Sequence, residues 1–411
     1  MALLNITLDQ EEILQLLSEN SGDAFKKLLT ESLNSVLKAE SQEQLRAAPY
    51  ERAEERTDSR NGFRDRELKT RIGTLTLHVP RHRKEPFRTL IFDNYCRSEA
   101  ALIACMAEMV VNGVSTRKIG KVMETLCGTS FSKSSVSELC RELDKDVEAF
   151  RNRPLEGRYP FVTVDATYFK VRENHRIVSK ALMIALASND QGHREIVGMQ
   201  VYANESEETW TDFLNGLKKR GLSNVLMITS DAHSGLIRAL GKTFPNVPWQ
   251  RCQFHFCRNI ADKAPKKVQA GIRTELREMF DAKTIEEARK KRDEIISDYQ
   301  DVAGAAMECL EEGFESSMTV MMLPAGYRRY YRTSNHIERL NRELKRRSDV
   351  IGVFPNEDSL IRLMGSVLME QNDGNMNTRK IFSAESYQAL LESGLAASLK
   401  EAAQEQQLLD A

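Results

Sequence analysis

The stretch Phe161-Val-Thr-Val-Asp-Ala-Thr-Tyr-Phe-Lys-Val-Arg172 places one carboxylate in the middle of an apolar run. Its β-branched and aromatic residues predict a strand. A charge inside a strand costs free energy unless a partner or a ligand pairs with it. Asp165 is therefore either the solvent-facing residue of an edge strand or part of a functional site. Two later carboxylates favour the second interpretation.

The residues that follow predict a mixed sheet covered by helices. Apolar segments at 176–188 and 194–202 are joined by turn residues, and shorter strands are expected at 225–229 and 247–251. An amphipathic helix is expected over 205–217. Three consecutive strands, followed by a helix and a buried parallel strand, match an α/β ribonuclease H-like core with carboxylates at strand ends.

The two later carboxylates also stand in unusual settings. Asp231 follows a buried strand and precedes a helix, where the alternative role is to cap that helix. Glu338 lies in the helical stretch Asn335-His-Ile-Glu-Arg-Leu-Asn-Arg-Glu-Leu-Lys345, where the alternative is an ordinary ion pair with Arg342. Because Arg342 and Lys345 share its helix face, Glu338 suits a metal-binding carboxylate beside phosphate-binding cations.

Positive charge is concentrated near Glu338. The chain of 411 residues has a formal net charge of −1, but residues 326–348 hold eight Arg or Lys against two Glu. Such a cluster in a near-neutral chain indicates a polyanion-binding patch, and the alternative is a solvated helix face. The candidate DNA contacts in this cluster are Arg328, Arg329, Arg339, Arg342, Lys345 and Arg346.

The composition and the apolar pattern argue against a membrane protein and against a disulfide-rich secreted protein. No apolar run approaches the roughly 20 residues that span a bilayer, and the start of the chain lacks the regions of a signal peptide. Seven scattered cysteines, an odd number, do not make a disulfide framework. We expect a cytoplasmic protein without membrane contact.

Residues 99–152 predict a helix-turn-helix-type DNA-binding domain. Helical patterns cover 99–112 and 116–126, and Ser132 can cap a third helix. The third helix opens with polar residues that can reach base edges or phosphates, namely Lys133, Ser134 and Ser135. The alternative is an ordinary helical bundle.

These segments predict an order of domains. They are an N-terminal helical region and arm (1–60), a short β and basic segment (61–98), the helix-turn-helix-like domain (99–152), the first part of the catalytic core (153–261), an inserted all-α subdomain (262–325), the rest of the core with the Glu338 helix (326–372) and a C-terminal tail (373–411). The tail is expected to be weakly helical and peripheral.

The motifs around the three carboxylates resemble those of the mutator-type DDE transposases of bacterial insertion sequences. The motifs are Val-Asp165-Ala-Thr-Tyr, Ser-Asp231-Ala-His-Ser-Gly and Asn-His-Ile-Glu338-Arg-Leu-Asn. Further motifs of that family stand in the same order over roughly residues 60–370, including Asn61-Gly-Phe-Arg64, Gly113-Val-Ser-Thr-Arg117, Trp210 and Trp249-Gln-Arg-Cys-Gln-Phe-His255. The resemblance implies a ribonuclease H-like core with a helical insertion between Asp231 and Glu338.

The resemblance implies catalytic and metal-binding roles for Asp165, Asp231 and Glu338. Three carboxylates in one cleft raise one another's pKa unless a cation neutralises them. Hard oxygen ligands favour two Mg²⁺ or Mn²⁺ ions, which can support both the cutting and the joining of DNA strands. The implied partners are the terminal inverted repeats of the element, target DNA and a second copy of the chain in a homodimer or larger assembly.

Cys252 and His255 form a Cys-x-x-His pair with two interpretations. Structural zinc takes four ligands, commonly in two close pairs, and no second pair stands at usable spacing in the sequence. The family carries a comparable pair after the second Asp, which implies an accessory element of the catalytic fold. Trp210 is likewise either a core residue or a base-stacking platform.

Two other functions fit parts of the sequence. A ribonuclease H-like nuclease or resolvase would cut DNA without strand transfer. A DNA-binding regulator would use residues 1–150 and carry an inactive core. The intact set of Asp165, Asp231 and Glu338 argues against the regulator.

Overall fold

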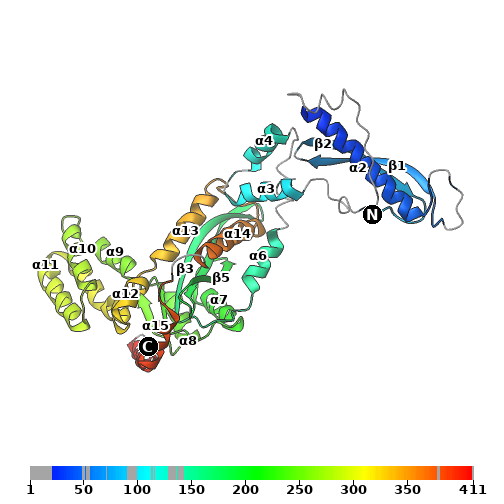
Figure 1. The fold of residues 1–411 in the computed structure, drawn as a ribbon. Helices are drawn as coiled ribbons and strands as arrows, with labels where there is room; N and C mark the ends of the chain where they lie inside the picture. The colour runs from blue at the N-terminus through cyan, green and yellow to red at the C-terminus, as the bar shows by residue number, and fades with distance from the viewer. Residues whose placement is uncertain are drawn as a thin grey trace. The chain divides into compact units, whose positions relative to one another are not determined.

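The computed structural model describes residues 21–48, 51, 56–70, 72–89, 100–112, 114, 116–127, 136, 143–376 and 380–409. The chain divides into two compact units, Met1–Glu142 and Leu143–Ala411. Both units contain helices, and both contain a sheet, so the architecture is mixed α/β (Figure 1). The α/β class expected from the sequence is confirmed at this level.

In the N-terminal unit a long helix packs on a two-stranded antiparallel sheet. Helix α2 (Ser21–Leu45) lies against strands β1 (Arg60–Thr70) and β2 (Gly73–His82). Their shared core is apolar and consists of Leu37, Leu68, Leu75, Leu77 and Val79. The alternation of apolar and polar residues over 71–80 predicts the second strand, whereas the polar, turn-rich residues 48–66 predict an arm or linker where β1 begins. Strand β1 escapes prediction because its charged residues face solvent and leave little apolar alternation.

Two short helices follow in the same unit. Helices α3 (Ala100–Val111) and α4 (Thr116–Cys127) share a small core that contains Met106, Ile119 and Met123. The expected third helix, with Lys133, Ser134 and Ser135, lies outside the described residues, and so do residues 1–20 of the expected N-terminal helical region. The helix-turn-helix therefore stays a prediction.

The second unit is built on a five-stranded mixed sheet. Strands β3 (Phe161–Glu173), β4 (Arg176–Ser188) and β5 (Arg194–Tyr202) are antiparallel, and the short strands β6 (Met227–Ser230) and β7 (Trp249–Arg251) add in parallel. The order is β5-β4-β3-β6-β7. The three long strands lie where the sequence predicts them, because their apolar runs bounded by turn residues are local signals.

Helices cover the sheet. Helices α7 (Glu207–Lys219) and α8 (Ser234–Thr243) pack on the face that carries Val162 and Ile228. Gly198 of β5 allows α7 to approach closely, because a Cβ there would lie 2.5 Å from the Leu217 side chain.

Three more helices of this unit pack together beside the strands. They are α6 (Leu143–Asn152), α13 (Asn335–Ser348) and α14 (Glu357–Met376). Helix α13 contacts β3, and α14 contacts β3, β5 and α6. A bidentate ion pair between Arg362 and Asp144 joins α14 to α6 at 2.6 and 2.7 Å. Residues 143–152, which the sequence assigns to the domain over 99–152, thus belong to the second compact unit.

A helical segment is inserted between β7 and the last part of the core. It comprises α9 (Gln253–Asp262), α10 (Gln269–Phe280), α11 (Ile285–Met318) and the short 3₁₀ helix η2 (Thr319–Met322), and α12 (Ala325–Tyr331) follows it. Phe256, Leu276, Leu310 and Phe314 are buried in its own core. The structure has helices over 262–325 as expected, but α9, which the sequence assigns to the first part of the core (153–261), packs with them.

The C-terminal segment packs on the sheet. Helices α15 (Ala384–Glu392) and α16 (Leu395–Leu409) bury Tyr387 and Leu399 in a cluster with Phe161, which points to the opposite face from Val162. The expectation of a peripheral tail is therefore wrong. The few apolar residues of the tail cover a sheet face, and sequence periodicity does not reveal that tertiary contact.

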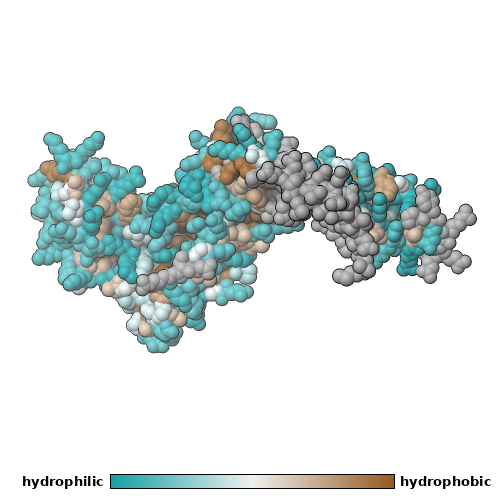
Figure 2. All heavy atoms as spheres, turned by 45° about the horizontal axis from the view of Figure 1, so that its top comes forward, coloured by the Kyte–Doolittle hydropathy of each residue, from teal (hydrophilic) through white to brown (hydrophobic). Residues whose placement is uncertain are grey.

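Among the described residues, no helix combines the length and the apolar character needed to cross a bilayer. Hydrophilic side chains cover most of the face shown in Figure 2.

Candidate active site

Strand register brings Asp165 and Asp231 to the same part of the sheet. Strands β3 and β6 run in parallel with Thr163 opposite Thr229, and each Asp follows two residues later. Asp231 stands in the loop that leads to α8 and accepts a hydrogen bond from its neighbour Ala232 N at 2.7 Å. The N-cap residue of α8 is His233, so Asp231 does not serve as the helix cap that the sequence also allowed.

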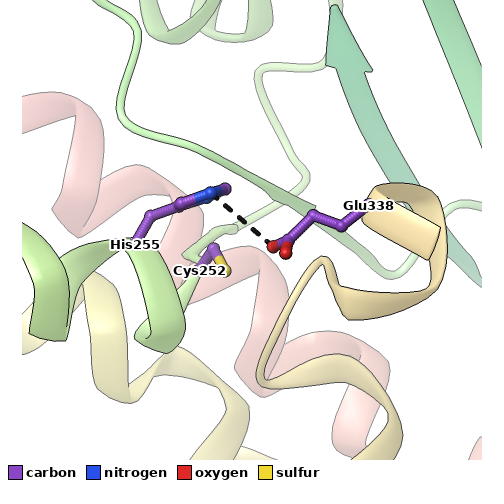
Figure 3. Close-up of side chains that lie close together, drawn as sticks. All are labelled: Cys252, His255 and Glu338. Atoms are coloured by element: carbon purple, nitrogen blue, oxygen red, sulfur yellow. Dashed lines mark ion pairs between the residues drawn. The ribbon is translucent and has the colours of Figure 1, made fainter. Parts of the chain in front are cut away.

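Glu338, in the first turn of α13, joins these residues through His255 of α9. His255 Nε2 lies 3.6 Å from Glu338 Oε1, and His255 Nδ1 lies 3.9 Å from Asp231 Oδ1. Figure 3 shows the Glu338 and His255 side chains pointing toward each other from two different helices. The carboxylate of Glu338 on α13 thus points toward α9.

Cys252, the N-cap residue of α9, is fully buried next to His255 and Glu338. Ser334 N donates to Cys252 Sγ at 3.3 Å. The Ser334 hydroxyl lies 3.1 Å from both Cys252 Sγ and Glu338 Oε1, and its single proton can be donated to one of them at a time. The Cys252–Ser334 contact therefore ties the start of α9 to the start of α13.

The protonation of Cys252 and His255 is linked. Burial raises the pKa of Cys252, but hydrogen bonds with His255 and Ser334 outweigh burial and leave the pKa below its ordinary value. The hydrogen bond with Cys252, followed by the nearby negative charges of Asp231 and Glu338, raises the pKa of His255 to about 9. The imidazole is therefore positively charged at neutral pH and balances the carboxylates on either side.

Asp165 is partly buried, and its surroundings change its pKa. Burial raises its pKa to about 7, and the negative charges of Asp231 and Glu205 add to that rise. Asp165 Oδ1 accepts a hydrogen bond from Ala166 N at 2.9 Å, and Oδ2 accepts one from Asn341 Nδ2 at 2.8 Å. A cation beside Asp165 would favour its ionised form.

Two residues of this site are missing from the sequence prediction. Asn341 stands one turn after Glu338 on the same face of α13, a spacing that could have identified it. Glu205 stands in the loop before α7, where a carboxylate carries no local signal of function. Only the fold places Glu205 close enough to affect Asp165.

Trp210 lies in the core. Its side chain is fully buried, packs edge-on against Phe213 at a ring distance of 5.9 Å and donates its indole N–H to Glu205 at 3.1 Å. Of the two roles that the sequence allowed, the structure places Trp210 in packing, because a buried ring offers no face to a nucleic acid base.

The basic residues of the 326–348 cluster divide into two groups. Arg328 is held within the fold, since its guanidinium donates to Leu323 O at 2.7 Å and to Lys283 O at 2.9 Å. Arg329 is exposed and stacks on Tyr330. The exposed basic residues on α13 are Arg339, Arg342, Lys345 and Arg346, although Arg346 is also paired with Glu343 at 2.6 Å.

One group of side chains has the spacing of a metal site. Potential ligand atoms of Cys252, His255 and Glu338 all lie within 4.8 Å of one another. This group offers three ligands, whereas structural zinc takes four. Asn341 Oδ1, beside Asp165, is buried without a hydrogen-bond donor. A buried oxygen without a donor, close to carboxylates, suits a cation that prefers oxygen ligands.

The comparisons with known proteins all match this chain to transposases. The family model described as "Transposase, Mutator family" matches residues 1–378. The chain is 42% identical over 377 residues to the transposase for insertion sequence element IS256 in transposon Tn4001 from Staphylococcus aureus, covering 91% of this chain and 96% of that protein. It is 38% identical to the transposase for IS1081 from Mycobacterium tuberculosis, with 92% of both chains covered. For the transposase of ISRM5 from Rhizobium meliloti the identity is 37%, with 88% of this chain and 91% of that protein covered. The chain belongs to the Mutator family of transposases.

Proposed function

We propose that this chain binds the terminal inverted repeats of its own insertion sequence, cuts a DNA strand there and joins the freed end to target DNA. Asp165, Asp231 and Glu338 are the catalytic carboxylates in this proposal. The observation that supports it is that Asp231 and Glu338, from two separate segments, lie on either side of His255. Asp165 stands on the strand next to the one that Asp231 follows. The relatives support the same activity, since each is named as the transposase of an insertion sequence element.

The proposed catalytic core is ribonuclease H-like. The supporting features are three antiparallel strands followed by two parallel ones, in the order β5-β4-β3-β6-β7. Asp165 lies on the central strand and Asp231 follows the neighbouring parallel strand. Polar residues at the ends of adjacent parallel strands are the usual place for a site in such sheets.

The oxygen atoms of this site fit Mg²⁺ or Mn²⁺. Asp165, Asp231 and Glu338 would hold the cations, and the buried Oδ1 atom of Asn341 is an oxygen without a hydrogen-bond donor beside Asp165. Two such cations, when bound, would activate the attacking hydroxyl and stabilise the leaving oxygen of the phosphodiester. Burial, with a smaller contribution from the charges of Asp231 and Glu205, raises the pKa of Asp165, and a bound cation would favour its ionised form.

Neighbouring residues would position the carboxylates and the DNA. Asn341 fixes the orientation of Asp165 through the 2.8 Å hydrogen bond. The exposed side chains of Arg339, Arg342 and Lys345 lie on the helix that carries Glu338, so they can bind the phosphates that flank the scissile bond. A salt dependence of DNA binding is expected from such contacts.

Recognition of the terminal repeats is proposed for the N-terminal unit. Its helices α3 and α4 are two of the three helices that the helix-turn-helix requires, and Lys133, Ser134 and Ser135 are the proposed contacts of the third. A homodimer or larger assembly would bring two DNA ends together, which light scattering of the complex with terminal-repeat DNA can test.

The direct experiment compares strand cleavage by wild-type protein and by Glu338→Gln on a duplex that carries the terminal repeat, with Mg²⁺ present. The matched control is Glu311→Gln, an exposed Glu on α11. We expect Glu338→Gln to bind the duplex normally and to cut it about 10³-fold more slowly, since several kcal/mol of transition-state stabilisation are lost. Normal cleavage by Glu338→Gln would contradict the proposal.

The same reagents separate the proposed transposase from a nuclease or resolvase that only cuts. Pre-cleaved terminal DNA is supplied with a labelled target, and joined products are resolved by electrophoresis. Strand joining that is lost in Glu338→Gln supports the transposase. Cleavage without any joining by the wild-type protein would support the nuclease.

A further inference from the structure

One end of the two-stranded sheet of the N-terminal unit carries an exposed aromatic side chain among basic ones. Phe63 of β1 is 53% exposed and stands opposite Pro80 of β2 in the strand register. Arg64 and Arg81, the neighbours of this pair along the two strands, are exposed as well. The Phe63 ring lies outside the apolar core that joins α2 to the sheet, so packing in that core does not account for it.

The backbone of β1 is irregular directly before Phe63. The pairing register with β2 shifts between Arg60 and Phe63, which marks a β-bulge. Gly62, within the bulge, has a φ of +74°, a conformation that favours glycine. A bulge bends its strand and redirects the side chains next to it. The local backbone therefore contributes to the orientation of Phe63.

Hydrogen bonds hold the residues after β2 against the start of β1. Arg83 N donates to Ser59 O at 2.9 Å. Lys84 N and Glu85 N donate to Asp58 Oδ2 at 2.8 and 3.1 Å. Asp58 Oδ1 accepts from Ser59 N at 2.6 Å, so both oxygens of this carboxylate already have donors. These contacts fix the backbone beside the sheet end and leave the side chains of Arg83 and Lys84 exposed.

Positive charge exceeds negative charge in this region. Residues 58–85 hold eight Arg or Lys against four Asp or Glu, in a chain whose formal net charge is −1. Within the described part of the chain, four of these cations make neither a hydrogen bond nor an ion pair through their side chains, namely Arg64, Arg81, Arg83 and Lys84. The acidic neighbour Asp65 is paired with His78. Such a group of unpaired cations attracts a polyanion.

The surface has little to offer to a protein partner. Among the described residues of β1 and β2, Phe63 is the one large apolar side chain that is exposed. A stable protein interface buries a far larger area, with an apolar centre from which charged residues are depleted. Contacts with the phosphates and sugars of DNA instead need cations and few apolar groups.

We propose that this sheet end is a second DNA-binding surface, which holds the backbone of duplex DNA without reading its sequence. We name it the ribbon end, and it consists of Phe63, Arg64, Arg81, Arg83 and Lys84. The cations bind phosphates, and the Phe63 ring packs on a deoxyribose between them. Two-stranded sheets are known elements of DNA-binding proteins.

This inference rests on the proposed function, because it assumes that the N-terminal unit binds DNA. It adds a sequence-independent anchor to the base contacts proposed for the helices of the same unit. Contacts with phosphates position a protein on the duplex, whereas contacts with base edges specify the sequence. The two kinds of contact therefore give different results on repeat and unrelated DNA.

The test measures binding of the full-length protein to two fluorescent duplexes by anisotropy, in EDTA so that no strand is cut. One duplex carries the terminal repeat, and the other has an unrelated sequence of the same length. The test variants are the double variant Arg81→Ala/Arg83→Ala and the single variant Phe63→Ala. The matched controls are Lys38→Ala and Phe25→Ala, which remove an exposed cation and an exposed ring from α2 of the same unit. Thermal unfolding verifies folding, and each test variant suffices alone if the other does not fold.

Loss of two phosphate contacts predicts a change in salt dependence. Each contact contributes about 0.9 to the slope of log K against log salt concentration, so the slope of the double variant should fall by about 1.8. Its affinity for both duplexes should fall about 10-fold or more near 0.15 M salt. Phe63→Ala should bind both duplexes about 5-fold more weakly with an unchanged slope, because the ring contributes apolar contact and no charge. The two controls should bind as the wild-type protein does.

Three results would overturn the inference. The first is wild-type affinity in either test variant when it is folded. The second is a loss confined to the terminal-repeat duplex, since a backbone contact affects both duplexes. The third is an unchanged DNA affinity together with an altered assembly size in light scattering, which would assign the surface to a second copy of the chain.

The wild-type protein separates this inference from the function on which it rests. If the wild-type protein prefers the terminal-repeat duplex and the test variants bind like it, only the role of the ribbon end is wrong. If the wild-type protein binds both duplexes equally and the test variants bind both more weakly, recognition of the repeat is wrong and the ribbon end stands. If the wild-type protein binds neither duplex, both are wrong.

Discussion

Each of the two units has an aspartate in the middle of a strand, and the two side chains differ in their exposure to solvent. Asp65 of β1 has a side chain that is 71% exposed, and it pairs with His78 at 2.6 Å. Asp165 of β3 is enclosed by the fold, and burial raises its pKa to about 7. Water stabilises the first charge at almost no cost, whereas the second costs free energy unless donors or a cation lie close to it. A carboxylate within a strand therefore indicates a site only when the fold encloses its side chain.

The largest expected effect is a difference in the rate of DNA cleavage between variants of the two aspartates. Asp165→Asn should reduce cleavage of terminal-repeat DNA by about 10³-fold, because a proposed cation ligand is lost. Asp65→Asn should cut at the wild-type rate, since its carboxylate faces solvent. Rates are measured under single-turnover conditions with saturating protein. Equal rates for the two variants would remove the functional difference between the strands.

The next effect concerns pH and stability. Because the pKa of Asp165 is raised from 3.8 to about 7, the folded chain holds this proton more tightly than the unfolded chain does. This stabilising contribution is complete below pH 4 and is lost as the pH rises to about 7, by at most about 1.4 kcal/mol per pH unit. In metal-free buffer, denaturant unfolding should show this loss in the wild-type protein and not in Asp165→Asn. The same pH dependence in both proteins would contradict the assigned burial.

A cation should reverse that loss. Mn²⁺ at 100 times its dissociation constant stabilises a folded protein by about 2.7 kcal/mol when it binds only the folded state. We expect the melting temperature of the wild-type protein and of Asp65→Asn to rise on addition of Mn²⁺, and that of Asp165→Asn to change much less. Scanning calorimetry measures all three. An equal rise in Asp165→Asn would place the cation elsewhere.

The smallest effect concerns the orientation of Asp165. Asn341→Ala removes the donor to Asp165 Oδ2 and should slow cleavage about 10-fold, as is typical when a supporting residue around a metal is lost. Asn335→Ala, at an exposed position of the same helix, serves as the control. An unchanged rate in Asn341→Ala would show that the strand alone orients Asp165.

Much of the sheet could be predicted from the sequence, because apolar alternation and turn residues are local. Strand β4 is a nearly continuous apolar run and lies where the sequence places it. Strand β1 could not be predicted, since most of its side chains face water. The packing of α15 and α16 depends on contacts with Phe161, more than 200 positions away in the chain, which periodicity cannot reveal.

Some residues of the candidate site could likewise be predicted from the sequence, and others could not. Asp165, Asp231 and Glu338 could be named from their unusual settings and from the family resemblance. The position of His255 between two of them could not, because it depends on how α9 packs against α13. Glu205 has no signal in its own segment, and it gains its setting only through contacts with Tyr168 and His233.

The most direct test of the central claim is the anomalous scattering of Mn²⁺ in crystals of the full-length protein bound to its terminal-repeat DNA. We expect Mn²⁺ within about 2.0–2.3 Å of carboxylate oxygens of Asp165, Asp231 and Glu338. A cation bound instead by Cys252 and His255, with Asp165 left without one, would contradict it.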